Sequence, residues 1–210
     1  MQLQSVNLAS PRQITIGKET VDTGIFKEPT TAPVAVGKLG LANDHIADLH
    51  NHGGEDQAVY LYSREEYAWW EAQLGRDLPD GQFGENFTIS DYGGGEPRIG
   101  DRYQINDLVL EASFVRIPCS KFGAKMGDMG FPKRFSAALK PGVYCRVITP
   151  GTVKAGDAIS FTPAPDGAPT AAEIFGVYLG IDRSREMVER CLASPMADGM
   201  RVRYLLWMEA

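Results

Sequence analysis

One cysteine in the sequence stands between two cations, in the run Arg116-Ile117-Pro118-Cys119-Ser120-Lys121. Positive charge near a thiol favours the thiolate, which is the form that attacks electrophiles and binds metals. A lone cysteine is as often buried and inert, so the local sequence leaves a reactive and a structural Cys119 open. A cysteine nucleophile would also need a histidine base and an orienting group, for which His52 with an acid could serve.

The charges around Cys119 are unevenly distributed along the chain. Residues 112–150 carry seven cations and one acid, Asp128, although the net charge of the whole chain is -6. A basic segment in an acidic protein indicates a focused site for an anionic ligand such as a phosphate; a solvated lysine-rich loop is the alternative. The acidic total argues against a general nucleic-acid binder. The seven cations are Arg116, Lys121, Lys125, Lys133, Arg134, Lys140 and Arg146.

All three histidines, His45, His50 and His52, fall within residues 45–52. Clustered imidazoles and carboxylates are typical zinc ligands, but a dinuclear site of this spacing needs further histidines downstream, and the chain has none. A polar loop opening onto a strand is the better interpretation. In it Gly53 and Gly54 allow close backbone approach to a ligand, and His52 donates a hydrogen bond or a charge. Solvated loop positions suit His45 and His50 better than His52.

The run Phe83-Gly84-Glu85-Asn86-Phe87 joins a glycine, an acid and an amide. Asn86 could make paired hydrogen bonds to the edge of a heterocycle or to backbone, and a structural turn role is equally open. The sequence contains neither a Walker-type phosphate loop nor a dinucleotide-binding glycine fingerprint.

Short strand-like segments separated by Gly, Pro, Asn and Asp dominate the first two thirds of the chain, a pattern typical of a barrel or sandwich. One helix interrupts them, capped by Ser63 with Glu66 and ended by Gly75; its aromatic residues are at core spacing. We expect strands over Gln2–Leu8, Arg12–Ile16, Pro33–Leu39, Gln57–Tyr62, Asn86–Ile89, Arg102–Ile105, Leu108–Val115, Val143–Thr149 and Ala158–Thr162.

A Pro-rich linker follows at residues 162–169. Thr170 and Glu173 then form a second capping box, Ser184 caps a helix through Cys191, and Arg201–Met208 fits a helix or a strand. These elements are too short for a large core of their own. We therefore divide the chain into a β domain, residues 1–163, and a short helical segment, residues 170–210.

The composition fits an ordinary globular protein, with 43% hydrophobic and 23% charged residues. No apolar run approaches the roughly 18 residues of a membrane span, and the first residues show no signal-peptide pattern. The three cysteines Cys119, Cys145 and Cys191 are too few for a disulfide framework. We expect a reducing compartment, with the cytoplasm as the default.

Taken in order, several segments resemble the MOSC domain, the module found at the C-terminus of molybdenum-cofactor sulfurases. They are similar above all to its stand-alone bacterial, YiiM-like members, and together span roughly residues 20–162. The matching stretches are Thr23–Pro29, Gly40–Asp44 running to His52–Gly54, Ala58–Tyr60 through the helix to Trp70, Phe83–Asn86, Ile99–Asp101, Arg116–Cys119, Gly142–Val147 and Gly156–Asp157.

This resemblance implies a mainly β fold, a MOSC-type β-barrel with a few helices, followed by a short three-helix segment. It implies that the barrel holds the molybdenum cofactor, a pterin dithiolene with a phosphate, with Cys119 linked to the metal or to sulfur transfer. It also implies reduction of small N-hydroxylated compounds. Pyridoxal phosphate is not expected, because the chain lacks the aminotransferase-like part of the sulfurases. Without a ferredoxin-type cysteine cluster, electrons must come from a separate reductase or ferredoxin-like partner.

The resemblance and the charges together assign the site. Cys119 is the expected metal ligand, and His52 or Asp44 delivers the proton. Asn43 replaces a common glycine, and Phe114-Val115 replaces a usual polar residue and proline before Arg116. Two alternatives stay open: a non-catalytic carrier of cofactor or of persulfide sulfur on Cys119, and a cysteine- or zinc-dependent hydrolase. The expected cofactor-binding residues are Lys27, Gly53, Gly54, Asn86, Arg116, Lys121 and Arg146.

Overall fold

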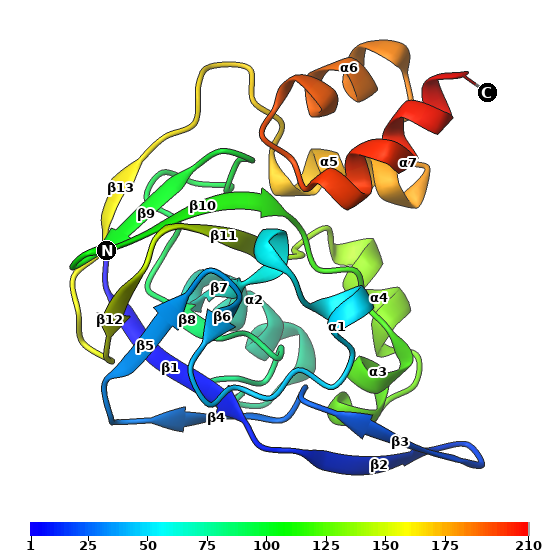
Figure 1. Ribbon diagram of the computed structural model, residues 1–210. Helices are drawn as coiled ribbons and strands as arrows, with labels where there is room; N and C mark the ends of the chain where they lie inside the picture. The colour runs from blue at the N-terminus through cyan, green and yellow to red at the C-terminus, as the bar shows by residue number, and fades with distance from the viewer. Residues whose placement is uncertain (210) are drawn as a thin grey trace.

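An eight-stranded mixed sheet forms the body of the computed structural model, which describes residues 1–209 apart from the side chains of residues 50, 51 and 209. Its strands are β1 (Leu3–Ala9), β4 (Lys27–Thr30), β7 (Val59–Ser63), β8 (Phe87–Ile89), β9 (Arg102–Ile105), β10 (Leu108–Phe114), β11 (Val143–Thr149) and β13 (Ser160–Thr162). Figure 1 shows the curvature of this sheet. Buried apolar residues of its strands form the main core cluster.

The structure does not confirm the expected β-barrel as a closed one. The strand order is β13-β9-β10-β11-β7-β8-β1-β4, and among the described residues the two end strands do not pair with each other. A barrel requires its first and last strands to share a ladder. The pairing of β7 with β8 is parallel, and β1 shifts register between Leu3 and Ser5 where it pairs with β8. The fold is therefore a sheet-rich α/β mixture rather than a barrel.

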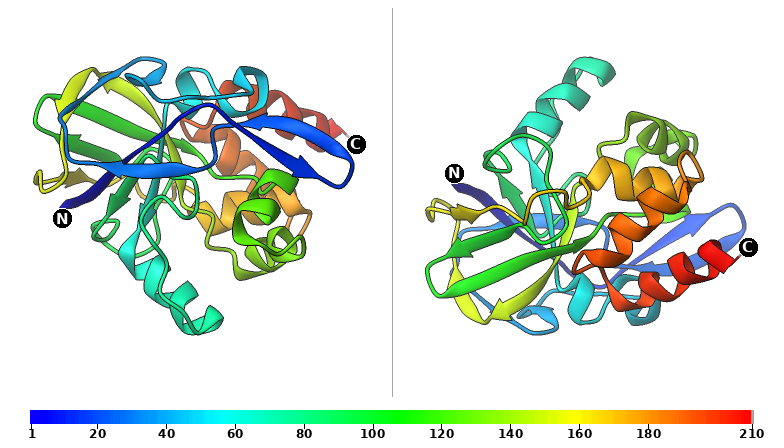
Figure 2. Two further views of the ribbon diagram at one scale, coloured as in Figure 1. Left: turned by 90° about the horizontal axis from the view of Figure 1, so that it is seen from below. Right: turned by 90° about the horizontal axis from the view of Figure 1, so that it is seen from above.

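Two smaller sheets flank the large one. The first contains β12 (Gly151–Val153), β5 (Val34–Gly37) and β6 (Gly40–Leu41). The second is a hairpin of β2 (Arg12–Ile16) and β3 (Glu19–Thr23), which projects from the body in both views of Figure 2. The sequence pattern predicted β2 correctly but missed β3, β4, β6 and β12, each five residues long or shorter.

The helix predicted after Ser63 is confirmed as α2 (Arg64–Leu74). Ser63 Oγ accepts a hydrogen bond from the Glu66 backbone N–H at 3.1 Å, and Gly75 ends the helix with a φ of 64°. Before it lie the short α1 (Leu49–His52) and the 3-10 turn η1 (Glu55–Gln57). Two further helices, α3 (Ser120–Met126) and α4 (Phe131–Ala138), lie in the basic segment and were not predicted.

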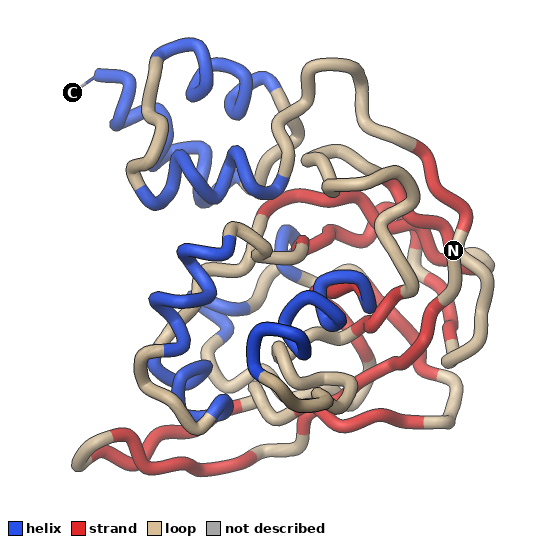
Figure 3. The backbone as a smooth tube through the Cα atoms, turned by 180° about the vertical axis from the view of Figure 1, so that it is seen from behind, coloured by secondary structure: helices blue, strands red, loops and turns tan. Residues whose placement is uncertain are grey.

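The aromatic residues of α2 belong to the core, as expected. Trp70 packs on Phe131 and Phe135, with ring centroids 5.0 and 6.0 Å apart. Phe122 of α3 meets Phe131 edge-on at 5.2 Å. The view from behind shows α2, α3 and α4 gathered on one side of the sheet (Figure 3). This aromatic cluster fixes the segment that carries Cys119.

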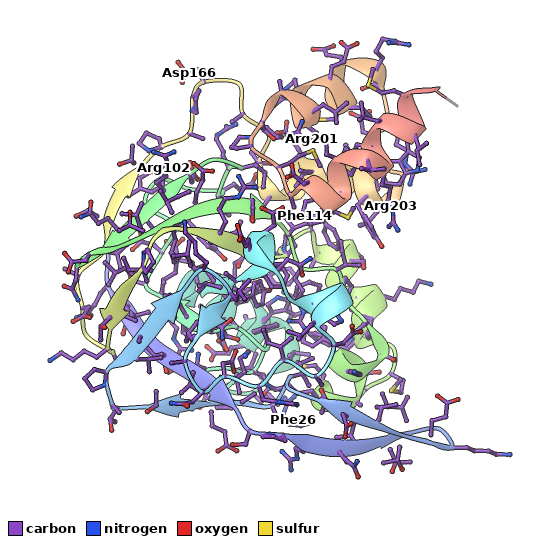
Figure 4. The ribbon with its side chains drawn as sticks, viewed as in Figure 1. Phe26, Arg102, Phe114, Asp166, Arg201 and Arg203 are labelled. Atoms are coloured by element: carbon purple, nitrogen blue, oxygen red, sulfur yellow. The ribbon has the colours of Figure 1, made fainter. Side chains whose placement is uncertain are left out.

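Three helices end the chain: α5 (Ala171–Leu179), α6 (Arg185–Ala193) and α7 (Asp198–Glu209). The Thr170–Glu173 capping box is present, and the ambiguous C-terminal run is helical. Phe114 of β10 points toward these helices and meets the ring of Tyr204 at 6.5 Å (Figure 4). The C-terminal helices therefore share their core with the sheet. Among residues 1–209, none of the helices combines the length and apolar character that crossing a bilayer requires.

Candidate functional site

A pocket of about 610 Å³, part of it open to solvent, brings together segments that are far apart in the sequence. It lies where β4, the loop after β6, α1 and the start of α3 converge. Seven of the residues predicted for the site line it: Lys27, Asp44, His52, Asn86, Arg116, Cys119 and Lys121.

Cys119 sits immediately before α3, in extended backbone conformation, and is partly buried. Burial raises the pKa of its thiol, but the hydrogen bond from His52 and the charge of Arg116 outweigh this effect. Together they lower the pKa from 9.0 to about 7. A substantial fraction of Cys119 is therefore thiolate at neutral pH. Burial raises the pKa values of Cys145 and Cys191 instead, so these two thiols stay protonated.

Arg116 is a buried cation without a carboxylate partner among the described residues. It is 6% exposed, and its guanidinium lies over the rings of Tyr60 and Phe122, 5.4 and 4.4 Å from their centroids. Its Nε has no hydrogen-bond acceptor within the described part of the chain. A buried, charged donor without an acceptor is costly unless a ligand or a solvent molecule satisfies it. Arg116 is thus available to an anion in the pocket.

Asp44 organises the opposite wall. Its carboxylate accepts hydrogen bonds from Lys27 Nζ, from Asn86 Nδ2 at 2.8 Å and from the Ala9 backbone N–H at 2.8 Å. Burial lowers the pKa of Lys27, and the Asp44 carboxylate opposes that shift. These contacts bring β1, β4 and the segment before β8 together at one point. Asp44 is therefore placed to hold Lys27 and Asn86 in position.

Three predicted residues lie outside this pocket. Gly53 and Gly54 are not among its lining residues; Gly54, with a φ of 93°, precedes η1. Arg146 points elsewhere and pairs with Asp56 at 2.7 Å and with Glu111 at 3.1 Å. The local count of charges could not show this, because both partners are distant in the sequence.

The other cations of the basic segment also separate. Lys125 does not line the pocket; it donates to the backbone oxygens of Ile25 and Gly81. Burial lowers its pKa to about 7. Arg134 pairs with Asp128 on the surface. Of the seven cations, only Arg116 and Lys121 line the pocket.

Two tyrosines of the site were not singled out from the sequence. Tyr60 and Tyr144 line the pocket on adjacent strands, with ring centroids 4.9 Å apart. The signal was strand alternation: Val143 and Cys145 are fully buried, so Tyr144 between them faces the other side of the sheet.

The three histidines have different positions. His45 lines the pocket with His52, rather than lying in a solvated loop. The side chain of His50 lies outside the described residues. Within the described part of the chain, no group of three His, Cys, Asp or Glu residues is arranged to hold a metal ion.

Comparison with known proteins identifies relatives of the chain. Residues 48–160 match the MOSC domain. The chain is 34% identical over 152 residues to the uncharacterized protein YflK of Bacillus subtilis, covering 72% of this chain and 69% of YflK. It is 29% identical over 182 residues to a protein of Gibberella moniliformis named "Reductase". That match covers 85% of this chain but only 32% of the fungal protein.

The fold matches as well. The crystal structure of YiiM from Geobacillus stearothermophilus superposes with a TM-score of 0.79 at 29% identity, and the match covers 98% of both chains. The residues that match the MOSC domain, 48–160, include the His52 loop, the Arg116-Ile117-Pro118-Cys119 run and the strands between them. The chain therefore belongs to the MOSC domain family, and its fold is similar to that of YiiM.

Proposed function

We propose that this protein is a molybdenum-cofactor-dependent reductase of small N-hydroxylated compounds, with Cys119 as the thiolate ligand of the metal. The observation that carries the proposal is the Cys119 thiol, which lies in a pocket with its pKa lowered to about 7 by His52 and Arg116. Membership of the MOSC family and the reductase-named fungal relative support a redox role.

The residues of the pocket fit an anionic, sulfur-ligated group. A thiolate is the ligand type that soft metals prefer. Arg116 offers a buried Nε donor that has no acceptor among the described residues. Lys121 lines the same pocket and adds a second positive charge near the thiol. Charge-assisted hydrogen bonds from such cations suit a phosphate or another anion.

Each side chain then has a defined task. Arg116, Lys121 and Lys27 hold the anionic part of the cofactor, and Asp44 fixes Lys27 and Asn86 in place. His52 stands beside Cys119 and delivers a proton to the leaving oxygen. Gly53 and Gly54 shape the backbone that carries His52. The partly exposed Tyr144, backed by the buried Tyr60, provides an aromatic surface against which a small flat substrate packs.

The net reaction is balanced by an external reductant. When bound, the molybdenum cofactor supplies the two-electron change that breaks the N–O bond, so that R–NHOH, two electrons and two protons yield R–NH₂ and water. The electrons come from a separate redox partner. The described cysteines offer only one pocket thiol, Cys119, and two buried ones.

Metal and pterin analysis tests this proposal directly. Protein from a host that makes the cofactor should contain molybdenum and pterin, and Cys119→Ser should lose the metal. Cys191→Ala, which changes a buried thiol far from the pocket, is the matched control and should keep it. Wild-type protein with a supplied reductant should convert hydroxylamines or amidoximes. Full molybdenum loading without turnover of either would favour a carrier; protein without molybdenum would refute the cofactor assignment.

A second candidate is a cysteine-dependent hydrolase, because a thiol hydrogen-bonded to an imidazole is also the core of a cysteine nucleophile. Cofactor-free protein distinguishes it. Hydrolysis of an activated thioester or ester with a stoichiometric burst, abolished by Cys119→Ser and by His52→Ala, would favour this candidate over the reductase.

A further inference from the structure

Asp56 joins the pocket loop to the C-terminal helices. Its Oδ2 accepts a hydrogen bond from the backbone N–H of Asp198, the first residue of α7, at 2.8 Å. Its Oδ1 accepts two from Arg146, from Nε at 2.8 Å and from a terminal nitrogen at 2.7 Å. One carboxylate therefore links η1, β11 and α7. We call this Asp56–Arg146 pair, with its contact to α7, the clip.

Ser113 makes further contacts at the same junction. Its Oγ lies 2.5 Å from the carbonyl oxygen of Asp56 and 3.0 Å from that of Tyr144. Its own carbonyl accepts a hydrogen bond at 2.9 Å from the backbone N–H of Ala197, which directly precedes α7. Ser113 is fully buried, so these contacts are not shared with bulk solvent. The start of α7 and the wall carrying Tyr144 are therefore tied to one point of η1.

The segment that carries His52 has little apolar packing of its own. None of the η1 residues is buried, and Leu49 of α1 is 70% exposed. Gly54, between α1 and η1, has open space where a side chain would stand. A segment without buried apolar contacts opens locally at low cost unless polar contacts hold it. The clip supplies those contacts four residues beyond His52.

We infer that Asp56 and Arg146 are positioning residues, through which the docked C-terminal helices hold the His52 loop in place over Cys119. This inference rests on the proposed function only in taking this pocket as the site. It also gives Arg146 a different task from binding the cofactor anion. Two of its nitrogens bond to Asp56 and the third to Glu111. Its guanidinium does not line the pocket.

The chain offers a matched control for Arg146. Arg102 also pairs with Glu111, at 2.7 Å, but from β9 and without a contact to Asp56. Arg102 and Arg146 lie on either side of Glu111 in the strand register, on β9 and β11. Arg146→Gln and Arg102→Gln therefore remove the same charge and the same type of bond to Glu111. Only Arg146→Gln opens the clip.

The test compares these variants as full-length, cofactor-free protein. In Arg146→Gln, amide hydrogen exchange over residues 45–57 should become at least about fivefold faster, because this segment loses the polar contacts between Arg146 and Asp56. In Arg102→Gln the rate should stay within about twofold of wild type. The side-chain ¹⁵N signal of His52 at fixed pH should shift in the first variant and not in the second. Arg146→Lys keeps the charge but loses the paired guanidinium donors to Asp56, so its exchange rate should lie between those of the other two variants.

A second variant keeps the test sharp if Arg146→Gln folds poorly. Asp56→Asn leaves the Arg146 charge in place but removes the opposite half of the clip, and it should reproduce the exchange and ¹⁵N changes. Equal protection of residues 45–57 in Arg146→Gln and Arg102→Gln would overturn the inference. So would a normal His52 signal in Asp56→Asn. Neither readout needs the cofactor. The positioning role of Asp56 and Arg146 can therefore fail while the molybdenum assignment holds, and the molybdenum assignment can fail while the positioning role holds.

Discussion

Lys27 and Asp44 form an ion pair of 2.5 Å whose side chains are only 8% and 4% exposed. Burying two charges is costly, and their attraction compensates only when the geometry is good and the remaining polar atoms are bonded. The Asp44 carboxylate meets that condition through its further bonds to Asn86 and to the Ala9 backbone. The pair therefore acts as the fixed point around which the pocket wall is built.

Removing one partner of this pair should destabilise the protein strongly. Asp44→Asn leaves the Lys27 ammonium buried without a counter-charge, so the free energy of unfolding should fall by about 3 kcal/mol or more. Urea denaturation measures this change. Glu189→Gln is the control, because Glu189 pairs with Arg185 on an exposed helix surface. Its loss should cost about 0.5 kcal/mol or less. Equal effects would show that the Lys27–Asp44 pair is not a structural anchor.

Cys119 should react as a thiolate at lower pH than an ordinary cysteine. Alkylation of cofactor-free protein by iodoacetamide should reach half its maximal rate near pH 7, because the His52 hydrogen bond and the Arg116 charge lower the thiol pKa to about 7. His52→Ala should move the midpoint upward. Peptide mapping supplies the internal control: Cys191, whose pKa burial raises to about 12, should stay unmodified. A midpoint near 9 in wild type would contradict the pocket geometry.

The strands were predictable where alternation and turn residues coincide. Arg12–Ile16, Arg102–Ile105 and Val143–Thr149 have the predicted bounds. Helices α3 and α4 were not predictable, because their sequences lack the usual signals for the start of a helix. Cys119 and Gly130 give no side-chain cap, and Gly123 weakens α3. Packing of aromatic rings against α2 stabilises both helices, and such tertiary contacts are invisible in a local pattern.

The site was predictable where the reactive group and its charged neighbours lie in one short run of the sequence. Arg116, Cys119 and Lys121 lie within six residues and reach the same pocket. Arg146 belongs to the same basic segment, yet it bonds to Asp56, 90 residues away along the chain. A local charge count detects the sign of a segment but not the direction of each side chain. Which cations face the ligand is decided by the register of β10 and β11 and by the docking of η1.

Glu66 should make the stability of the protein depend on pH. Burial raises the pKa of this carboxyl from 4.5 to about 7, although the Tyr92 hydroxyl, which donates to it at 2.6 Å, opposes the shift. Because the folded pKa is raised, the stabilisation is complete below pH 4.5 and is lost as the pH rises through 7. The total change is about 3 kcal/mol.

Glu66→Gln tests this dependence, because an amide resembles the protonated acid and does not titrate. The difference in unfolding free energy between wild type and Glu66→Gln should drift by about 3 kcal/mol between pH 4.5 and pH 8, with the variant gaining relative to wild type. Glu65→Gln, which changes the exposed neighbour on α2, should give a flat difference over the same range. A flat difference for Glu66→Gln would mean that Glu66 titrates normally.

Gly24 should be intolerant of even one added methyl group. A Cβ at this position would lie 1.9 Å from the carbonyl oxygen of His45, so the two backbone segments would have to move apart. This close contact holds the loop of Asp44 and His45 against the strand end that lines the pocket. Gly37 is the matched control, because a Cβ there meets no atom within 4 Å and its backbone is not left-handed.

Gly24→Ala should therefore lower the unfolding free energy by about 2 kcal/mol or more, whereas Gly37→Ala should change it by about 0.5 kcal/mol or stabilise slightly. The displaced loop should also carry Asp44 away from Lys27 and Asn86. Gly24→Ala protein made in a cofactor-competent host should then retain less molybdenum per chain than Gly37→Ala. Equal stability and equal metal content in the two variants would show that this backbone contact neither closes the fold nor shapes the pocket.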